Sequence, residues 1–228
     1  MIKQSLFDGK VEVGISEIND GNMRFFGGNE GEIIENQKRL CGSINLSEAA
    51  RIRTVYGERN DFTEYKEITK ENLANYSINN AETEIIVSDG LVTRMLEVGL
   101  LLPLADCLGA VIFDEEYGVV GLLHAGRQNI EQDGPKKFIE YLRDNFGSKP
   151  EKLRIFCSPY ALNYRIMALG GKSIQEAAMG QFASAGILPE NVIDPKVDTV
   201  SDENFPSNSS GDFTKRFAIV VKMMVNKE

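Results

Sequence analysis

Two β-rich runs joined by a short acidic turn are the feature that most constrains the fold of this chain. Residues 108–114 read LGAVIFD and residues 117–123 read YGVVGLL, and both runs are dense in residues that favour strands. The segment DEEYG at 114–118 carries acidic residues, with a glycine just after the turn. This order predicts an antiparallel β-hairpin.

The hairpin brings the only histidine of the chain close to one of its three cysteines. With Glu115 and Glu116 at the tip, Cys107 lies directly opposite His124, and a turn centre displaced by half a residue makes the pair diagonal. Directly opposed side chains have Cβ atoms about 4.5–5.5 Å apart. A thiolate and an imidazole at this spacing can share a metal ion or act as nucleophile and base. Small residues flank both and leave room for a ligand: Ala105, Gly109, Ala125 and Gly126.

Helices and strands alternate along the rest of the chain. Apolar spacing and terminal glycines predict helices at 31–42, 132–147 and 171–186. Apolar runs predict strands within 89–107, at 151–160 and in the closing run FAIVVKMMV, 217–225. The polar residues 58–82 have weak periodicity and are expected to form a surface excursion with short elements. The predicted class is α/β, in the layered α+β sense, with a mixed β-sheet covered by helices in one domain spanning 1–228.

Charge and composition disfavour several classes of partner. The sequence has 34 acidic and 25 basic residues and a net charge of −9, which disfavours binding to nucleic acid or to an anionic membrane surface. It has no run of about 18 apolar residues, and its N-terminal MIKQSLFDGK does not read as a signal peptide. Cys41, Cys107 and Cys157 are widely spaced, so free thiols and a cytoplasmic location are expected.

The central motifs resemble a known family. Residues 89–93 read DGLVT, 105–108 read ADCL and 124–126 read HAG, in the order found in the bacterial laccase-domain family. Its members are described as polyphenol oxidases and as zinc-dependent purine nucleoside phosphorylases with adenosine deaminase activity. Weaker similarity extends over most of the chain, at ENQKRL (35–40), CSPYALNY (157–164) and DFTKRFAIVV (212–221).

The resemblance implies an α/β/β/α layered fold, similar to that of the cytotoxic necrotizing factors, and a zinc ion held by two histidines and one cysteine. Cys107 and His124 match two of these ligands. The third belongs to a Gln-Val-His-Gly motif that reads Thr-Val-Tyr-Gly here, so Tyr56 stands in the place of the histidine. Because catalytic zinc usually takes three protein ligands, we expect zinc to bind weakly or not at all.

Three further positions depart from the family pattern. Its Trp-Arg after His-Ala-Gly is Arg127-Gln128, its early Ser-Thr-Arg reads Ser16-Glu17-Ile18, and its late arginine pair is Ser209-Ser210. Arginine is well suited to holding the phosphate that a phosphorylase uses, so these changes weaken the implied reaction. Arg216 is expected to form a structural ion pair.

The resemblance gives a first hypothesis, in which the chain cleaves or deaminates purine nucleosides, with inorganic phosphate as the co-substrate. The candidate catalytic residues are Cys107, His124 and Asp106; the candidate substrate-binding residues are Asp89, Arg127 and Gly126; the candidate metal ligands are Cys107, His124 and Tyr56.

Two alternatives remain open from the sequence. In one, Cys107 and His124 act without metal, as in a hydrolase or deamidase, with Asp106 or Asp89 orienting the imidazole. In the other, the chain is a catalytically weak relative with a degraded zinc site that binds a ligand. The sequence leaves the oligomeric state open.

Overall fold

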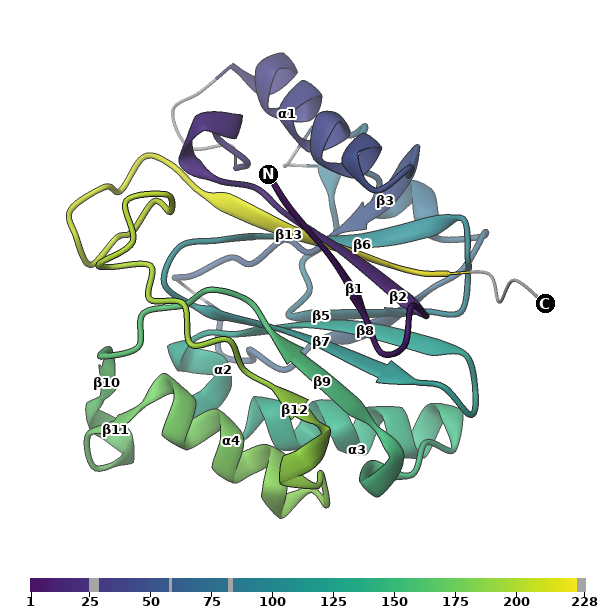
Figure 1. Ribbon diagram of the computed structural model, residues 1–228, viewed down its shortest axis with the longest axis vertical. Helices are drawn as coiled ribbons and strands as arrows, with labels where there is room; N and C mark the ends of the chain where they lie inside the picture. Colours follow the sequence, from purple (N-terminus) through teal and green to yellow (C-terminus); the bar gives the residue numbers. More distant parts are fainter. Residues whose placement is uncertain (25–28, 58, 82–83, 225–228) are drawn as a thin grey trace.

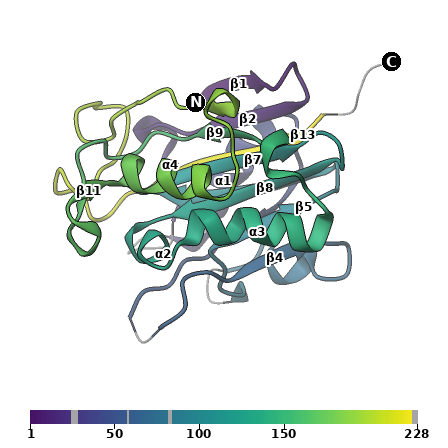
Figure 2. The ribbon, with the colours of Figure 1, turned by 90° about the horizontal axis from the view of Figure 1, so that it is seen from below.

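The computed structural model describes residues 1–24, 29–57, 59–81 and 84–224. Two β-sheets pack face to face, and helices cover both outer faces of the pair (Figure 1). The α-helices in this part of the chain are α1 (Glu30–Ser43), α2 (Arg127–Glu131), α3 (Gly134–Phe146) and α4 (Ile174–Ser184). Helix α1 lies on one side, and α2, α3 and α4 lie together on the other (Figures 1 and 2). The layers therefore follow the order α/β/β/α, and the predicted fold class is confirmed.

The first sheet has five strands in the order β1-β2-β13-β6-β3. Its strands are β1 (Ile2–Leu6), β2 (Val11–Ile15), β3 (Glu48–Arg51), β6 (Val98–Leu104) and β13 (Phe217–Met223). All neighbours are antiparallel except β3 and β6. The last residue of the predicted closing strand, Val225, lies outside the described residues.

The second sheet has six strands in the order β12-β9-β7-β8-β5-β4. Its strands are β4 (Tyr65–Ile68), β5 (Gly90–Thr93), β7 (Leu108–Asp114), β8 (Val119–Ala125), β9 (Arg154–Cys157) and β12 (Val192–Ile193). The β4–β5 and β9–β12 pairs are parallel and the others antiparallel, so the sheet is mixed. A separate two-stranded ribbon joins β10 (Arg165–Ile166) to β11 (Lys172–Ser173).

The central hairpin is buried on both faces, which explains why its two runs are almost wholly apolar. Val111 and Leu122 belong to the core between the two sheets, whereas Ala110 and Leu123 belong to the core under α2, α3 and α4. Alternate residues of a strand point to opposite faces, so each strand supplies both cores.

The ends of the predicted helices follow local signals. Helix α3 begins after Asp133, which has φ 59°, and stops at Gly147, whose φ of 75° is the left-handed conformation that glycine adopts most easily. Helix α4 begins at a capping box in which Ser173 accepts from the Glu176 N–H and Glu176 accepts from the Ser173 N–H. The three predicted helices are confirmed, with shifts of up to three residues at their ends. None of the helices in the described residues is both long enough and apolar enough to cross a bilayer.

The polar segment 58–82 is more than a surface excursion. Its strand β4 pairs with β5, and Tyr65, Ile68 and Tyr76 are buried. Residues 58 and 82 lie outside the described residues. The expectation of short elements is met, but the expectation that the segment lies on the surface is wrong, because these side chains and that of Ile78 enter the hydrophobic cores.

The hairpin forms, but its register differs from the predicted one. His124 pairs with Gly109, and Asp114 pairs with Val119. The loop therefore has four residues rather than two, because the Asp114 carboxylate accepts the Tyr117 N–H at 3.2 Å and Gly118 adopts a φ of 61°. The predicted direct opposition of Cys107 and His124 is wrong by two residues. A slip of two keeps every side chain on its predicted face, whereas a slip of one would reverse it.

Candidate functional site

Cys107 and His124 lie together at one end of the space between the two sheets. The register, continued by one residue, places Cys107 opposite Gly126 and diagonal to His124. A Cβ atom on Gly126 would lie 3.0 Å from His124 Nε2 and 3.2 Å from Cys107 Sγ. Because both atoms are this close to one point, they are no more than about 6 Å apart. The absent side chain of Gly126 is thus what lets the thiol and the imidazole converge.

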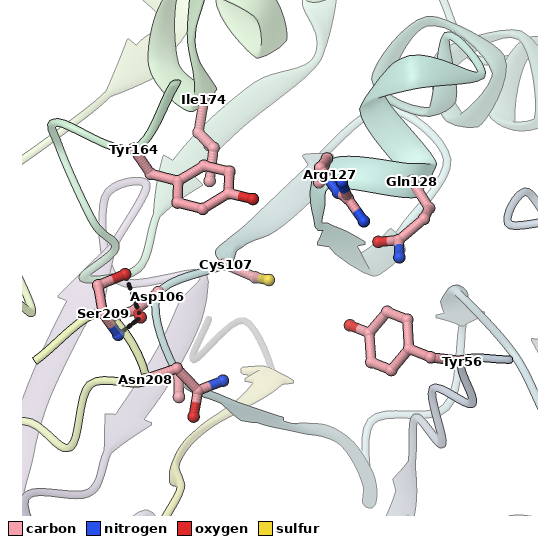
Figure 3. A pocket seen from close by; sticks show the side chains of 10 residues that line it. Tyr56, Asp106, Cys107, Arg127, Gln128, Tyr164, Ile174, Asn208 and Ser209 are labelled. Atoms are coloured by element: carbon pink, nitrogen blue, oxygen red, sulfur yellow. Dashed lines mark hydrogen bonds between the residues drawn. The ribbon is translucent and has the colours of Figure 1, made fainter. Parts of the chain in front are cut away.

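Asp106 sets the direction in which the chain enters β7. Its φ of 71° is the left-handed conformation, which aspartate tolerates better than most residues. One carboxylate oxygen accepts from Thr199 Oγ1 at 2.8 Å, and the other accepts from the N–H and the hydroxyl of Ser209 at 2.7 and 2.9 Å (Figure 3). Both oxygens are therefore engaged, and Asp106 ties the loop around Ser209 to the site.

Tyr56 reaches the same place from a loop distant in sequence. Its hydroxyl oxygen lies 3.5 Å from Nε2 of His124, and in Figure 3 the hydroxyl points towards Cys107. The three side chains singled out as metal ligands are therefore neighbours. Tyr56 exposes 44% of its surface, yet its hydroxyl end is enclosed, and burial raises the pKa of this group above its ordinary value.

Two cavities meet at these residues. The inner pocket has a volume of about 110 Å³, and its lining includes Arg24, Tyr56, Cys107, His124, Asn208 and Arg216. The outer pocket has a volume of about 350 Å³, and its lining includes Tyr56, Cys107, Arg127, Gln128, Tyr164 and Asn208 (Figure 3). Tyr56, Cys107 and Asn208 line both pockets and form the junction between them.

The electrostatics of the inner pocket favour a neutral thiol and a neutral imidazole. Burial, reinforced by the positive charges of Arg24 and Arg59, lowers the pKa of His124 to about 3. Burial, with the negative charge of Asp106, raises the pKa of Cys107 to about 11, although part of this residue is accessible from the outer pocket. A thiolate–imidazolium pair is therefore disfavoured at neutral pH.

The inner pocket also contains two arginines, Arg24 and Arg216, that were not predicted to lie there. Arg24 lies in the segment between β2 and α1, and its guanidinium donates to the Thr54 carbonyl at 2.8 Å. Arg216 immediately precedes β13. The ion pair predicted for Arg216 is wrong, because its guanidinium donates to the carbonyls of Phe213 and Lys215 instead. The signal for Arg216 was present in the Thr-Lys-Arg run that resembles the family's Thr-Gly-Arg. No local pattern marks Arg24.

The remaining candidates lie around this centre. Asp89 is buried behind it, where it forms a bidentate ion pair with Arg59 and accepts the Glu64 N–H at 3.0 Å. The Asp89 carbonyl also accepts the His124 N–H at 2.8 Å, so Asp89 supports the strand that carries the imidazole. Arg127, at the start of α2, is exposed and lines the outer pocket. The other cysteines, Cys41 and Cys157, are free, as expected, and both are buried.

The residues present do not fit the zinc centre that the resemblance implies. Within the described ranges, no three His, Cys, Asp or Glu side chains are grouped so that they could hold a metal ion. Cys107 and His124 are ordinary zinc ligands, but Tyr56 is a protonated phenol, and two guanidinium groups line the same cavity.

Comparisons with solved structures identify the fold. YlmD from Geobacillus stearothermophilus superposes with a TM-score of 0.83 at 16% identity, covering 95% of this chain and 93% of that one. YfiH from Bacillus licheniformis gives 0.80 at 16% identity, with coverages of 94% and 93%. The Neisseria meningitidis protein NMB0706 gives 0.78 at 13% identity, with coverages of 98% and 99%. At these identities the likeness establishes the fold alone.

Sequence comparison places the chain in a family. A purine nucleoside phosphorylase of Campylobacter jejuni is 26% identical over 149 residues, which are 58% of this chain and 66% of the relative. The match thus spans slightly less than two thirds of that protein. The family model described as multi-copper polyphenol oxidoreductase laccase matches residues 11–166, more than half of the chain. The chain therefore belongs to this laccase-domain family.

Proposed function

We propose that the chain cleaves purine nucleosides by phosphorolysis, with the nucleoside in the outer pocket and inorganic phosphate in the inner one. A phosphate oxygen forms a bond to C1′ of the ribose while the bond from C1′ to the base nitrogen breaks. The base leaves with that electron pair and takes up a proton, which yields ribose 1-phosphate and free base. Family membership and the name of the Campylobacter relative support this choice of reaction.

The observation that carries the proposal is that Arg24 and Arg216 both line one small cavity. Among the described residues that line the inner pocket there is no Asp or Glu, and burial together with the charge of Arg24 lowers the pKa of Arg216. An anion between the two guanidinium groups would be attracted by both of them. The planar guanidinium group matches the geometry of a phosphate and can bind it in bidentate fashion. Arg24 and Arg216 thus bring two guanidinium groups from distant segments into one cavity.

The outer pocket suits the rest of the substrate. Its volume of about 350 Å³ is within the usual range for small-molecule sites, and Tyr56 and Tyr164 offer aromatic surface to a planar base. Arg127 and Gln128 can donate hydrogen bonds to the base as negative charge develops on it. At the junction, the buried Oδ1 of Asn208 has no hydrogen-bond partner among the described residues, and we assign it to a ribose hydroxyl.

Cys107 lies at the junction, where C1′ would lie, and His124 lies in the inner pocket beside it. As neutral groups, they contact the sugar without neutralising the arginines beside them. The same neutrality argues against a nucleophilic cysteine, which reacts as the thiolate. The copper chemistry in the family's description is not proposed, because imidazoles are the main ligands of such centres and the full sequence has one histidine.

The decisive experiment measures base release from inosine, guanosine and adenosine with and without phosphate, by chromatography of the free base and of ribose 1-phosphate. We expect release to require phosphate. The Arg24→Met and Arg216→Met variants should each raise the KM for phosphate about 10- to 100-fold, because each loses hydrogen bonds to a charged ligand. The matched control is Arg143→Met, on the exposed face of α3, which should behave like the wild type.

Other outcomes separate the competing functions. Base release at the same rate without phosphate would identify a hydrolase and overturn the proposal. Conversion of adenosine to inosine would add the deaminase activity implied by the family resemblance. Binding of a nucleoside without turnover, under any of these conditions, would favour the ligand-binding alternative.

A further inference from the structure

One wall of the outer pocket carries the side chains of Arg127 and Gln128, at the start of α2. The next two residues of this helix, Asn129 and Ile130, are buried, and Asn129 Nδ2 donates to the Phe62 carbonyl at 2.7 Å. The buried side of α2 is therefore fixed, and Arg127 and Gln128 extend into the pocket from its other side (Figure 3). Within the described residues, neither of these two side chains forms a hydrogen bond or an ion pair, so their donors are available to a ligand.

The opposite wall holds a carboxylate whose oxygens already have partners. Figure 3 shows Asp106, Asn208 and Ser209 across the pocket from Arg127 and Gln128. Asp106 is the one acidic side chain that lines this pocket in the described part of the chain, and both of its oxygens accept hydrogen bonds from the protein. A nucleoside whose ribose contacts Asn208, as proposed above, extends its base towards Arg127 and Gln128.

The two classes of purine differ at the edge that this wall would contact. A 6-oxopurine presents two neighbouring acceptors, N7 and O6, whereas adenine presents the acceptor N7 beside the N6 amino donor. The guanidinium of Arg127 is a rigid fork of donors with no acceptor, so it matches N7 and O6 but sets donor against donor at N6. The amide of Gln128 can rotate to serve either purine. Arg127 therefore distinguishes the two classes of base, and Gln128 does not.

We propose that Arg127 is the specificity-determining residue of the outer pocket and selects nucleosides of 6-oxopurines, inosine and guanosine, over adenosine. The inference rests on the proposed function for the presence of a purine nucleoside in this pocket, and it adds which purine is accepted. Because Arg127 is exposed, water screens part of its attraction. We therefore expect a preference of about 10-fold, near the lower end of the range for a bidentate contact to a base.

Equilibrium binding tests this selection without requiring turnover. The full chain is titrated with inosine, guanosine and adenosine by isothermal titration calorimetry in phosphate-free buffer. We expect the wild type to bind the two 6-oxopurine nucleosides about 10-fold more tightly than adenosine. In Arg127→Met the Kd for inosine should rise about 10-fold while the Kd for adenosine changes little, so the preference should disappear. The exposed position of Arg127 means that this variant should fold like the wild type.

An analogue that lacks one acceptor links the effect to a single contact. 7-Deazainosine has a carbon in place of N7, so it should bind the wild type about 10-fold more weakly than inosine, and Arg127→Met about equally well. A purely structural role of Arg127 would not couple its loss to one atom of the base. Gln128→Met is the matched comparison on the same wall and should weaken inosine and adenosine by the same factor. Arg143→Met, on the exposed face of α3, should match the wild type in every titration.

The outcomes distinguish failure of this inference from failure of the proposed function. Equal binding or equal phosphorolysis of inosine and adenosine, or a preference that survives in Arg127→Met, would overturn the inference and leave the proposed reaction standing. A preference for inosine that Arg127→Met removes, without phosphate-dependent release of base, would support the inference and contradict the proposed reaction. A protein that binds none of these nucleosides would contradict both.

Discussion

The inner and outer pockets share a junction but are built on different principles. In the inner pocket the thiol and the imidazole are held on or beside strands, with His124 in β8 and Cys107 just before β7, although Tyr56 and Asn208 enter it from loops. The outer pocket is walled by loops and by the starts of helices, including Arg127 at the beginning of α2 and Tyr164 beside the β10–β11 ribbon. Strands fix positions more rigidly than loops do, so the inner pocket is suited to chemistry and the outer pocket to substrate selection.

The largest expected effect comes from filling the gap that lets the inner pocket form. In Gly126→Ala the new Cβ would lie 2.6 Å from Cε1 of His124, so the imidazole must move. The φ of Gly126 is −87°, which alanine adopts freely, so the damage is confined to the contacts of the new Cβ with His124 and Cys107. Displacing a group in the site by about 1 Å costs about 100-fold in rate. We expect kcat/KM for phosphorolysis to fall about 100-fold, while nucleoside binding in the outer pocket changes little.

The matched control for this change is Gly42→Ala. Gly42 is exposed in α1, and nothing lies within 4 Å of the position of an added Cβ. This variant should be fully active. A Gly126→Ala enzyme that is equally active would contradict the importance of the junction.

A smaller effect is expected from releasing the wall of the outer pocket. Asp106→Ala removes three hydrogen bonds to Thr199 and Ser209 and leaves alanine in the left-handed conformation. The two losses together should lower the free energy of unfolding by about 2 kcal/mol, measured by urea denaturation. The KM for nucleoside should rise because the loop that carries Asn208 is no longer held.

Asp106→Asn provides the comparison for that variant. The amide keeps one acceptor and tolerates the left-handed conformation, so it should lose clearly less stability than Asp106→Ala. Equal losses in the two variants would mean that the carboxylate does not hold the loop in the way described.

The smallest effect is a pH dependence that belongs to the inner pocket. The pKa of His124 is about 3 in the folded chain and about 6.5 in an unfolded one, so the unfolded chain binds the proton first as the pH falls. The stability gained by keeping His124 neutral is therefore complete above about pH 6.5 and decreases below it. Between pH 7.5 and 5.5, metal-free wild type should lose about 1 kcal/mol more than His124→Gln, measured by urea denaturation in chelator. Equal losses would show that the imidazole is solvated.

Much of the fold was predictable because it follows from local patterns. The hairpin, the three longer helices and a mixed sheet covered by helices were inferred from periodicity and from end signals such as Gly147, whereas the order of the layers was implied by the family resemblance. The register was missed because the four-residue loop depends on the hydrogen bond that the Asp114 carboxylate accepts from the Tyr117 N–H. The length of the segment between the two strands does not reveal this bond. The adjacent strands β5 and β6 lie in different sheets, and no local signal in 90–104 distinguishes this from one sheet.

Some residues of the candidate site were likewise predictable from the sequence, and others were not. Cys107, His124 and Tyr56 were singled out from motifs, and the structure brings them together. Arg24 was missed because the backbone contact that brings it to the site joins segments far apart along the chain: the N–H of Met23 donates to the carbonyl of Arg216 at 3.0 Å. The functions of all these residues remain predictions for the experiments above.

By itself the sequence determined the hairpin, the covering helices and the closeness of a thiol and an imidazole, because strand periodicity and turn chemistry act over a few residues. The order of the layers and the place of Tyr56 followed from the family resemblance. Only the tertiary structure decided what surrounds the thiol and the imidazole. Cations from distant segments converge there because sheet pairing joins strands that lie far apart along the chain, and no local pattern records which charges such pairing brings into one cavity.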